Sequence, residues 1–189
     1  MATLDPRTTA LVLIDLQDGI VAGDRAPRSG HAVVETSKNL AARFREKQAP
    51  VVLVHVGWRS EGEVPSRHTD EALPVPSGGT PPAFYAFVDG LREPDDVVVL
   101  KHHWGAFTGT DLDLQLRRRG VKTVVVAGIA TNLGVESTVR SAWELSYDVV
   151  VVEDACTSFT APMHAFAFEH ILPRIARITS ADDLTLGGE

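Results

Sequence analysis

Residues 123–132 read Thr123-Val124-Val125-Val126-Ala127-Gly128-Ile129-Ala130-Thr131-Asn132, and this stretch decides the fold. Its first half is a short, nearly continuous run of apolar, mostly β-branched residues. Runs of that kind, without polar alternation, are typical of strands covered on both faces, as in a parallel sheet. The second half passes through small residues into a helical pattern over 132–146. The stretch therefore predicts a strand–turn–helix unit of an α/β protein.

The same unit recurs along the chain. Further apolar runs, which we interpret as strands, lie at 10–14, 51–56, 97–100 and 149–152, with a weaker one at 177–179. Helical patterns lie near 31–48, 110–119 and 162–173. Because alternating strands and helices imply right-handed crossovers, we predict a three-layer α/β/α sandwich. We expect a Rossmann-like, mainly parallel six-stranded sheet with strand 10–14 in the centre, and a single domain over 1–189.

Composition excludes several classes of protein. The 189 residues are 44% hydrophobic and 23% charged, and the formal net charge is −7 without an offsetting Lys/Arg stripe, which argues against nucleic acid as a partner. No apolar stretch is long enough to span a membrane, and the N-terminus does not have the pattern of a signal peptide. Cys156 is the only cysteine, which excludes an intrachain disulfide and fits a reducing cytoplasm.

Two charged residues follow predicted strands. Asp15 comes after 10–14 and Lys101 after 97–100. Reactive residues of parallel sheets gather beyond the carboxyl ends of the strands, and adjacent strands lie about 4.8 Å apart, so the two groups are expected to meet. Such a pair indicates a general acid or base tuned by burial and a neighbouring cation. The alternatives are a helix-capping or loop-fixing aspartate and a snorkelling surface lysine.

The turn after strand 123–127 predicts an anion site. Small residues there leave backbone N–H groups bare at a helix N-terminus, beginning at Ala130. Thr131 and Asn132 are alternatively plain helix caps. Gly134 would lie in the first helical turn, where glycine costs up to about 1 kcal/mol relative to alanine. A glycine at that place indicates close approach by a ligand or by another backbone.

These strand ends, in this order, resemble the isochorismatase-like hydrolases of the cysteine hydrolase superfamily. The motifs are an Asp-x-Gln pair, a lysine followed by Ala-Phe, and a Gly-x-x-Thr-Asn turn; here they are Asp15 with Gln17, Lys101 with Ala106-Phe107, and Gly128 to Asn132. The resemblance covers nearly the whole chain, to about Ser180. It implies that Asp15 and Lys101 are catalytic and that Gln17 and the turn residues bind substrate. It further implies a cis Ile129–Ala130 peptide and a homodimer or higher homo-oligomer.

Gly134 departs from most of that family, whose members have a nucleophilic cysteine at this position. The resemblance therefore implies a hydrolase without a covalent cysteine intermediate. Isochorismatases proper also have glycine here; an aspartic acid protonates their vinyl-ether substrate and water captures the resulting cation. They differ from this chain, however, by an aromatic residue and a histidine in place of Ala130 and Asn132. Their substrate is also a dicarboxylate, which a pair of arginines would hold. The candidates for such a pair in this chain lie in predicted loops: Arg28, Arg59 and Arg67.

Three aromatic residues follow strand ends: Trp58, Trp104 and Phe107. We expect them to line an apolar pocket for a planar or cyclic substrate, with rim closure or a subunit interface as the alternative. We expect neither a metal nor another cofactor. The region His55-Val56-Gly57-Trp58-Arg59 lacks the Asp-x-His spacing of the zinc-binding relatives, and His102 and His103 are adjacent and would point to opposite faces of a strand.

The leading hypothesis is a small-molecule hydrolase, acting on a vinyl-ether or C–N bond, in which water attacks directly. Asp15 would be the general acid or base and Lys101 its electrostatic partner, while the N–H groups of Ala130 and Gly134 would hold an anion. One alternative is a non-catalytic member that binds a metabolite or a protein in the same cleft. A further alternative is an amidase that uses Cys156, which follows the fifth strand.

Overall fold

The computed structural model describes residues 2–58, 64, 69–71 and 80–187. Its main sheet contains six strands, which are β2 (Thr9–Ile14), β3 (Val51–Val56), β4 (Val97–Lys101), β5 (Thr123–Ile129), β6 (Asp148–Thr157) and β7 (Arg177–Thr179). Their order is β4-β3-β2-β5-β6-β7, and every neighbouring pair is parallel. The predicted parallel six-stranded sheet with its first strand in the centre is therefore confirmed.

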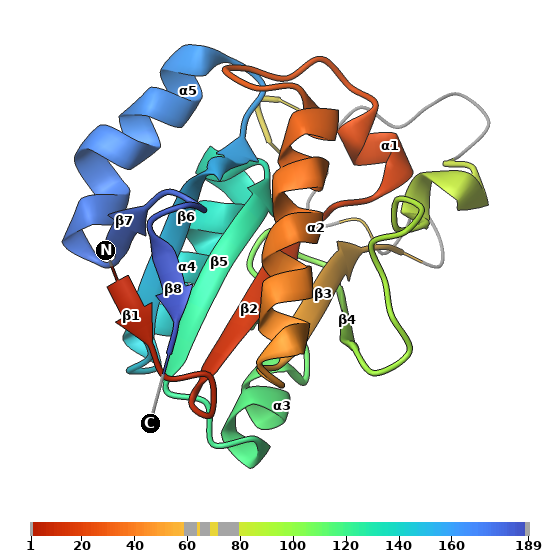
Figure 1. Cartoon of the computed structure of the whole chain (residues 1–189). Helices are drawn as coiled ribbons and strands as arrows, with labels where there is room; N and C mark the ends of the chain where they lie inside the picture. The colour runs from red at the N-terminus through yellow and green to blue at the C-terminus, as the bar shows by residue number, and fades with distance from the viewer. Residues whose placement is uncertain (1, 59–63, 65–68, 72–79, 188–189) are drawn as a thin grey trace.

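Helices cover both faces of this sheet. In Figure 1, α2 (Gly30–Glu46) crosses the front of the strands and α4 (Glu136–Glu144) lies behind them. The remaining helices are α1 (Asp18–Val21), α3 (Leu112–Arg118) and α5 (Ala161–Phe166). Among the described residues, no helix combines the length and the apolar composition that a membrane span requires.

Two predicted helices contain π-helical or 3₁₀ turns in addition to α-helix. The pattern over 132–146 begins as a π-helical turn, η3 (Thr131–Val135), before α4. The pattern over 162–173 is split into α5, a second π-helical turn, η4 (Ala167–Ile171), and a 3₁₀ turn, η5 (Leu172–Arg174). A further 3₁₀ turn, η2 (Pro82–Tyr85), precedes β4 in the chain.

Short strands at the two ends of the chain form a separate pair. β1 (Ala2–Leu4) lies parallel to β8 (Leu184–Leu186), so the termini come together in front of the main sheet (Figure 1). A three-residue strand carries little apolar periodicity, so the sequence indicates β7 only weakly and β1 and β8 not at all.

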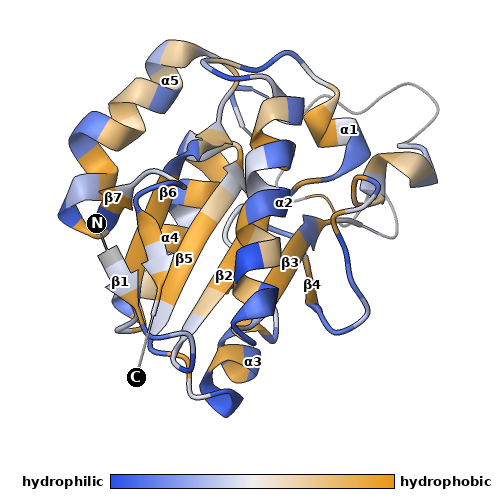
Figure 2. Cartoon of the chain, in the orientation of Figure 1, coloured by the Kyte–Doolittle hydropathy of each residue, from blue (hydrophilic) through white to orange (hydrophobic). Residues whose placement is uncertain are grey.

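The core consists of the strands and of the helix faces that pack on them. All six residues of β2 are buried, and Figure 2 shows the apolar strands in orange behind α2, whose ribbon is largely blue. Helix α2 begins at the cap Ser29, whose hydroxyl accepts from the Ala32 N–H at 3.2 Å. It buries Val33, Leu40 and Phe44, which lie on one face at helical spacing.

The order of the strands places β3 between β2 and β4. The expectation that Asp15 and Lys101 end adjacent strands is therefore wrong, although all strands end at one edge of the sheet. The sequence did not indicate which strand separates them, because strand order is set by tertiary packing and not by local pattern. Lys101 reaches Asp15 only because its side chain is long.

Gly128 lies where the pairing of β5 with β6 changes register, and its φ is +128°. A Cβ atom there would overlap the carbonyl oxygen of Ile14 on β2 and would lie 2.7 Å from its nitrogen. Only a glycine lets these two central strands approach each other so closely.

We expect Gly128→Ala to lower the free energy of unfolding by about 1–3 kcal/mol more than Gly109→Ala, because only the former inserts an atom into packed backbone. Gly109 is the control for a Cβ atom without neighbours, since its Cβ would meet nothing within 4 Å; its φ of +70° is also less demanding than the +128° of Gly128. Urea unfolding of both variants, followed by circular dichroism, measures the difference. Equal losses would show that backbone conformation alone, and not close approach, requires Gly128.

Candidate active site

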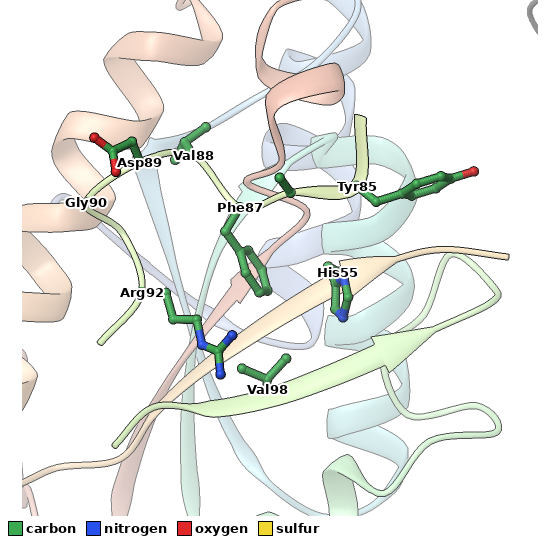
Figure 3. A pocket seen from close by; sticks show the side chains of 9 residues that line it. His55, Tyr85, Phe87, Val88, Asp89, Gly90, Arg92 and Val98 are labelled. Carbon is green, nitrogen blue, oxygen red and sulfur yellow. The ribbon is translucent and has the colours of Figure 1, made fainter. Parts of the chain in front are cut away.

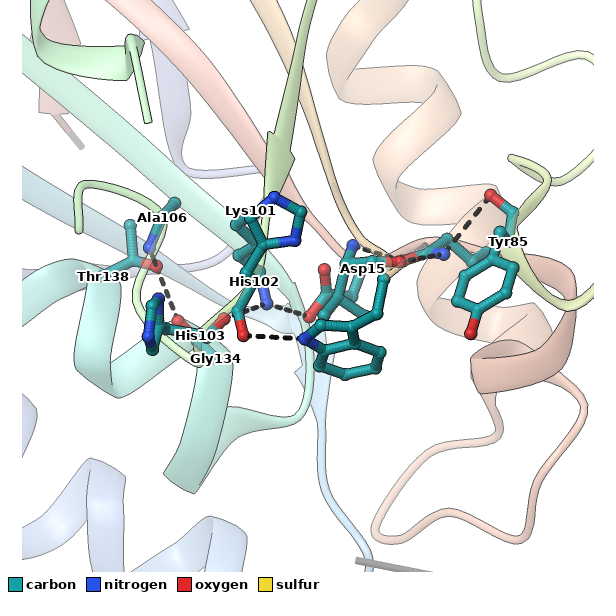
Figure 4. A network of polar contacts seen from close by, with 11 residues as sticks. Asp15, Tyr85, Lys101, His102, His103, Ala106, Gly134 and Thr138 are labelled. Atoms are coloured by element: carbon teal, nitrogen blue, oxygen red, sulfur yellow. Dashed lines mark hydrogen bonds and ion pairs between the residues drawn. The ribbon is translucent and has the colours of Figure 1, made fainter. Parts of the chain in front are cut away.

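A buried ion pair forms the centre of the site. Lys101 Nζ lies 2.7 Å from Asp15 Oδ2 and donates a second hydrogen bond to the His103 carbonyl oxygen at 3.1 Å (Figure 4). The two side chains are only 2% and 8% exposed. Because removing a charge from water is costly unless an opposite charge replaces the solvent, each group depends on the other.

Asp15 has an unusual conformation and environment. Its φ is +54°, a left-handed value that aspartate tolerates better than most residues. Its Oδ1 atom is buried and has no hydrogen-bond partner among the described residues. Burial raises the pKa of the carboxyl group from 3.8 to about 6, although the Lys101 ammonium opposes this rise. The group can therefore gain or lose a proton close to neutral pH.

Gly134 brings the main chain against this carboxyl group. A Cβ atom at Gly134 would lie 3.2 Å from Asp15 Oδ2 and 3.0 Å from Ile14 Cγ2. Both distances are shorter than ordinary van der Waals contact, so any side chain at this position would begin at the carboxylate. The structure thus places residue 134 next to the candidate acid–base group.

The turn that carries Gly134 is fixed by its own backbone and by one hydroxyl group. The Ile129–Ala130 peptide bond is cis, and the Ala130 carbonyl oxygen accepts from the N–H groups of Leu133 and Val135 at 3.1 and 3.2 Å. The buried Thr138 hydroxyl donates to the Gly134 carbonyl oxygen at 2.6 Å.

Thr138 also ties this turn to the segment after Lys101. Its oxygen accepts from the Ala106 N–H at 3.1 Å (Figure 4). A single side chain on α4 therefore connects the turn of Gly134 with the loop that follows β4.

Thr131 and Asn132 do not cap the helix. Ala130 occupies the cap position and makes no side-chain hydrogen bond there. The Thr131 hydroxyl lies 2.8 Å from Nδ1 of His164, and Asn132 Oδ1 accepts from the Ser158 hydroxyl. Both side chains thus anchor the turn to the chain that follows β6, and their oxygen atoms are engaged within the protein.

Gln17 is a structural residue in this arrangement. Its side chain is fully buried; Nε2 donates to the carbonyl oxygens of Val56 and Tyr85 at 3.0 and 3.3 Å, while Oε1 accepts from the Val56 N–H at 2.8 Å. Because both amide hydrogens have main-chain acceptors, Gln17 has no donor left for a substrate. That Gln17 contacts substrate, as the resemblance implies, stays a prediction.

The three aromatic candidates have different environments. Trp58 Nε1 donates to the His102 carbonyl oxygen at 3.1 Å, which holds the indole beside the end of β4. Trp104 is 52% exposed, and its carbonyl oxygen is 3.5 Å from the Cβ position of Gly134. Phe107 packs against Tyr147, with ring centroids 5.9 Å apart, and adds to the core. The structure therefore does not support Phe107 as part of a pocket at Asp15.

Cys156 is enclosed in the sheet. It is 0% exposed and lies opposite Gly128 in the pairing of β6 with β5. Burial raises the pKa of its thiol to about 12, so the reactive thiolate is almost absent at neutral pH.

Of the three arginine candidates, Arg28 lies near Cys156 and donates to the carbonyl oxygens of Glu153 and Cys156. Arg59 and Arg67 lie outside the described residues.

A depression of about 450 Å³ lies elsewhere, over β3 and β4 (Figure 3). Its lining residues are His55, Tyr85, Ala86, Phe87, Val88, Asp89, Gly90, Arg92 and Val98. Asp15, Lys101 and Gly134 do not line it. We place the candidate active site at the ion pair, because a buried carboxyl group with a raised pKa and a charged partner is typical of acid–base sites.

Several positioning residues could not be identified from the sequence. Thr138 is 32 residues away from its partner Ala106, and His164 is 33 residues away from Thr131. No local pattern links such distant polar residues. From the sequence alone, His164 therefore cannot be distinguished from a buried histidine that only packs in the core.

Comparison with known proteins identifies relatives over nearly the whole chain. The isochorismatase domain matches residues 9–183. The uncharacterized isochorismatase family protein YecD of Escherichia coli O157:H7 is 44% identical over 185 residues, which are 97% of this chain and 98% of that protein. The ureidoacrylate amidohydrolase RutB of Methylobacterium radiotolerans is 35% identical over 175 residues, or 80% of this chain and 68% of that protein.

Solved structures give the same result. An isochorismatase family protein from Burkholderia thailandensis superposes with a TM-score of 0.89 at 46% identity, over 96% of this chain and 95% of that one. The N-carbamoylsarcosine amidase of Thermoplasma acidophilum superposes with a TM-score of 0.74 at 26% identity, over 93% and 98% of the two chains.

We expect the Asp15 carboxyl group to titrate with a midpoint near pH 6, measured from the ¹³C shift of its carboxyl carbon. The exposed Asp5, whose pKa is lowered by hydrogen bonds from Arg7, is the internal control and should titrate below 3.8. Because the folded-state pKa of Asp15 exceeds its unfolded value, its contribution to stability is present at low pH and is lost as pH rises through about 6.

Lys101→Met removes the cation that opposes this rise, so the Asp15 midpoint should move further above 6. Lys38→Met makes the same change at a lysine that pairs with Glu35 on α2, and should leave the midpoint unchanged. A midpoint below 4 in the wild type, or a downward shift in Lys101→Met, would contradict the proposed electrostatics.

Proposed function

Because this chain belongs to the isochorismatase family, we propose that it is a small-molecule hydrolase in which Asp15 transfers protons and water attacks the substrate directly. The observation that carries the proposal is the position of Gly134. Residue 134 faces the Asp15 carboxyl group yet supplies no nucleophile, while the buried Asp15–Lys101 pair is retained.

The two oxygens of Asp15 have different roles in this proposal. Oδ2 is held by Lys101 at 2.7 Å, whereas Oδ1 has no partner among the described residues. We therefore assign the exchangeable proton to Oδ1, because Oδ2 is held by Lys101. A carboxyl group with a pKa of about 6 is suited to this task, since general acid–base groups work best when their pKa lies near the working pH.

Asp15 would act first as an acid and then as a base. On a vinyl ether, its proton moves to the terminal carbon, and water adds to the resulting oxocarbenium carbon. That water returns a proton to the carboxylate, and the hemiketal collapses to a carbonyl compound and an alcohol. On a C–N bond, the carboxylate would instead take a proton from the attacking water and pass it to the leaving nitrogen.

Negative charge that develops on the substrate would be held at the turn of Gly134. We assign this role to the N–H groups of Ala130 and Gly134, which lie at the beginning of the helical segment. Such groups are aligned before the reaction begins and lose little energy in reorganisation. The aromatic side chains of Trp58 and Trp104 would border this space.

The relatives favour two kinds of bond. The family takes its name from isochorismatase, and two of the relatives described above are named as amidohydrolase and amidase. Glycine at 134 favours the vinyl ether, because an amide activated only by a general base is a poor target for water. A ureido or carbamoyl substrate is the second candidate.

Two other functions have less support. A non-catalytic binding protein would not require a buried ion pair whose formation costs desolvation energy. An amidase that uses Cys156 would require an accessible thiolate, but this thiol is 0% exposed and its pKa is raised to about 12.

The first test is turnover of isochorismate, ureidoacrylate and N-carbamoylsarcosine, followed by mass spectrometry. We expect hydrolysis of at least one of them, with isochorismate the first choice.

Asp15→Asn should lower kcat by roughly a hundredfold or more, because it removes the titrating proton while it keeps the shape. Lys101→Ala should be comparably damaging. Asp5→Asn is the control and should retain wild-type turnover, since Asp5 lies on the surface. Full activity in Asp15→Asn would remove the hydrolase proposal.

The same assay distinguishes direct water attack from thiol chemistry. Cys156→Ala and treatment with iodoacetamide should leave turnover intact. Gly134→Cys should not raise it, because the new Cβ atom would crowd Asp15 Oδ2 at 3.2 Å. Inactivation through Cys156, or an acyl adduct trapped on it, would support the amidase alternative instead.

Self-association is a separate part of the proposal. Among the described residues several large apolar side chains are exposed, including Trp143 at 54%, Phe159 at 48% and Phe166 at 59%. Exposed apolar surface of this kind is often covered in oligomers. Light scattering should give a multiple of the 20.4 kDa chain mass at micromolar concentration. A monomer mass would refute this part and leave the chemistry unaffected.

A further inference from the structure

A buried histidine on α5 contacts the turn of Gly134 at Thr131. His164 is 3% exposed, and its Nδ1 atom lies 2.8 Å from the hydroxyl oxygen of the fully buried Thr131. Its other nitrogen, Nε2, has no hydrogen-bond partner among the described residues, but it faces Glu153 Oε1 at 3.8 Å. Threonine hydroxyl, imidazole and carboxylate are thus aligned in that order.

This arrangement resembles a nucleophile triad but cannot act as one. A nucleophile must reach the substrate, whereas Thr131 is 0% exposed. The remaining role for these residues is to hold the backbone of the turn. We propose that His164 is a positioning residue, which accepts the Thr131 hydrogen bond at Nδ1 and thereby fixes the turn that presents Gly134 to Asp15.

The direction of the hydrogen bond follows from the surroundings of the imidazole. A neutral imidazole has its proton on only one nitrogen. With the proton on Nε2, an N–H group faces the Glu153 carboxylate, and Nδ1 can accept from Thr131. With the proton on Nδ1, a lone pair would face that carboxylate, which is unfavourable. Glu153 therefore selects the Nε2–H form, as carboxylates near histidines commonly do.

The neutral state of His164 also follows from its neighbours. Burial and the Arg28 guanidinium lower the pKa of His164 below 6.5, and Glu153 on β6 opposes this effect only partly. The other contacts of the ring are uncharged, namely Thr131 on η3 and Phe168, whose ring centroid lies 4.6 Å away. At neutral pH the imidazole is therefore an acceptor for Thr131.

Hydrogen bonds consequently hold the turn at both ends. At its beginning, Thr131 bonds to His164 and Asn132 accepts from Ser158; near its end, the Gly134 carbonyl oxygen accepts from Thr138. Gly134 is the fourth residue of the five in this turn. Loss of the His164 contact releases the end of the turn that carries Thr131, so the N–H groups of Ala130 and Gly134 would lose their alignment with Asp15.

The first experiment needs no substrate, and its result does not depend on the proposed function. Long-range ¹H–¹⁵N correlation of protein labelled at histidine should show His164 neutral at pH 7 with its proton on Nε2. In Thr131→Val, which removes the hydroxyl but keeps the shape, the Nδ1 resonance should move toward that of an unbonded acceptor. A proton on Nδ1, a charged ring, or no change in Thr131→Val would overturn the assignment.

The second experiment rests on the proposed function and uses whichever substrate is turned over. His164→Gln and Thr131→Val should each lower kcat about tenfold, the effect of one lost hydrogen bond. The double variant should fall no further than the larger of the two, because both remove the same contact. His164→Asn and Thr131→Ser keep a polar atom at the Nδ1 and hydroxyl positions, and should stay within about threefold of wild type.

Stability separates positioning from mere packing. If His164 only filled space, Asn and Gln would lower the free energy of unfolding without a difference between them in kcat. Additive losses in the double variant, or equal kcat in His164→Asn and His164→Gln, would overturn the proposal. If no substrate is turned over while the ¹⁵N result stands, the hydrolase proposal has failed and the Thr131–His164 assignment has not.

Discussion

The Asp15–Lys101 ion pair is the constraint on which the candidate site depends. It forms across the end of an intervening strand, β3, and both charges are almost removed from water. Such a pair is tolerated only if each charge compensates the other, so the two strand ends must be placed accurately. The N–H of Gly57 donates to the Lys101 carbonyl oxygen at 3.1 Å, which extends the pairing of β3 with β4 up to the lysine itself.

Burial and charge oppose each other at this pair, and their balance defines what Asp15 can do. Burial favours the protonated carboxyl group, while Lys101 favours the carboxylate, and the resulting pKa of about 6 lies between the two extremes. A stronger cation contact would leave a permanent carboxylate, and deeper burial alone would leave a permanent acid. The left-handed conformation of Asp15 turns the chain immediately after β2.

Local patterns predicted the strands and their terminal residues, because continuous apolar runs and the polar residues that end them are visible in the sequence. Parallel topology predicted that Asp15 and Lys101 meet at one edge of the sheet, whereas the place of Gly134 in the same site was implied by the resemblance to the isochorismatase-like hydrolases. The sequence did not predict the order of the strands, the direction of the Phe107 ring or the hydrogen bonds of Gln17. Each of these depends on packing between distant segments. The contact of Thr131 with His164 belongs to the same group.

The approach of Gly134 to the carboxyl group limits the kind of chemistry. At 3.2 Å from Asp15 Oδ2, a Cβ atom would force the carboxylate or the turn to move by a few tenths of an ångström. Glycine removes that conflict, and it also leaves no side-chain nucleophile for covalent attack on an amide carbon. Proton transfer is then the chemistry that the described part of the site supplies. Water alone attacks readily only where protonation has created a strong electrophile, as it does when a vinyl ether becomes an oxocarbenium ion. The geometry around Gly134 therefore favours substrates that acid activates over those that need covalent catalysis.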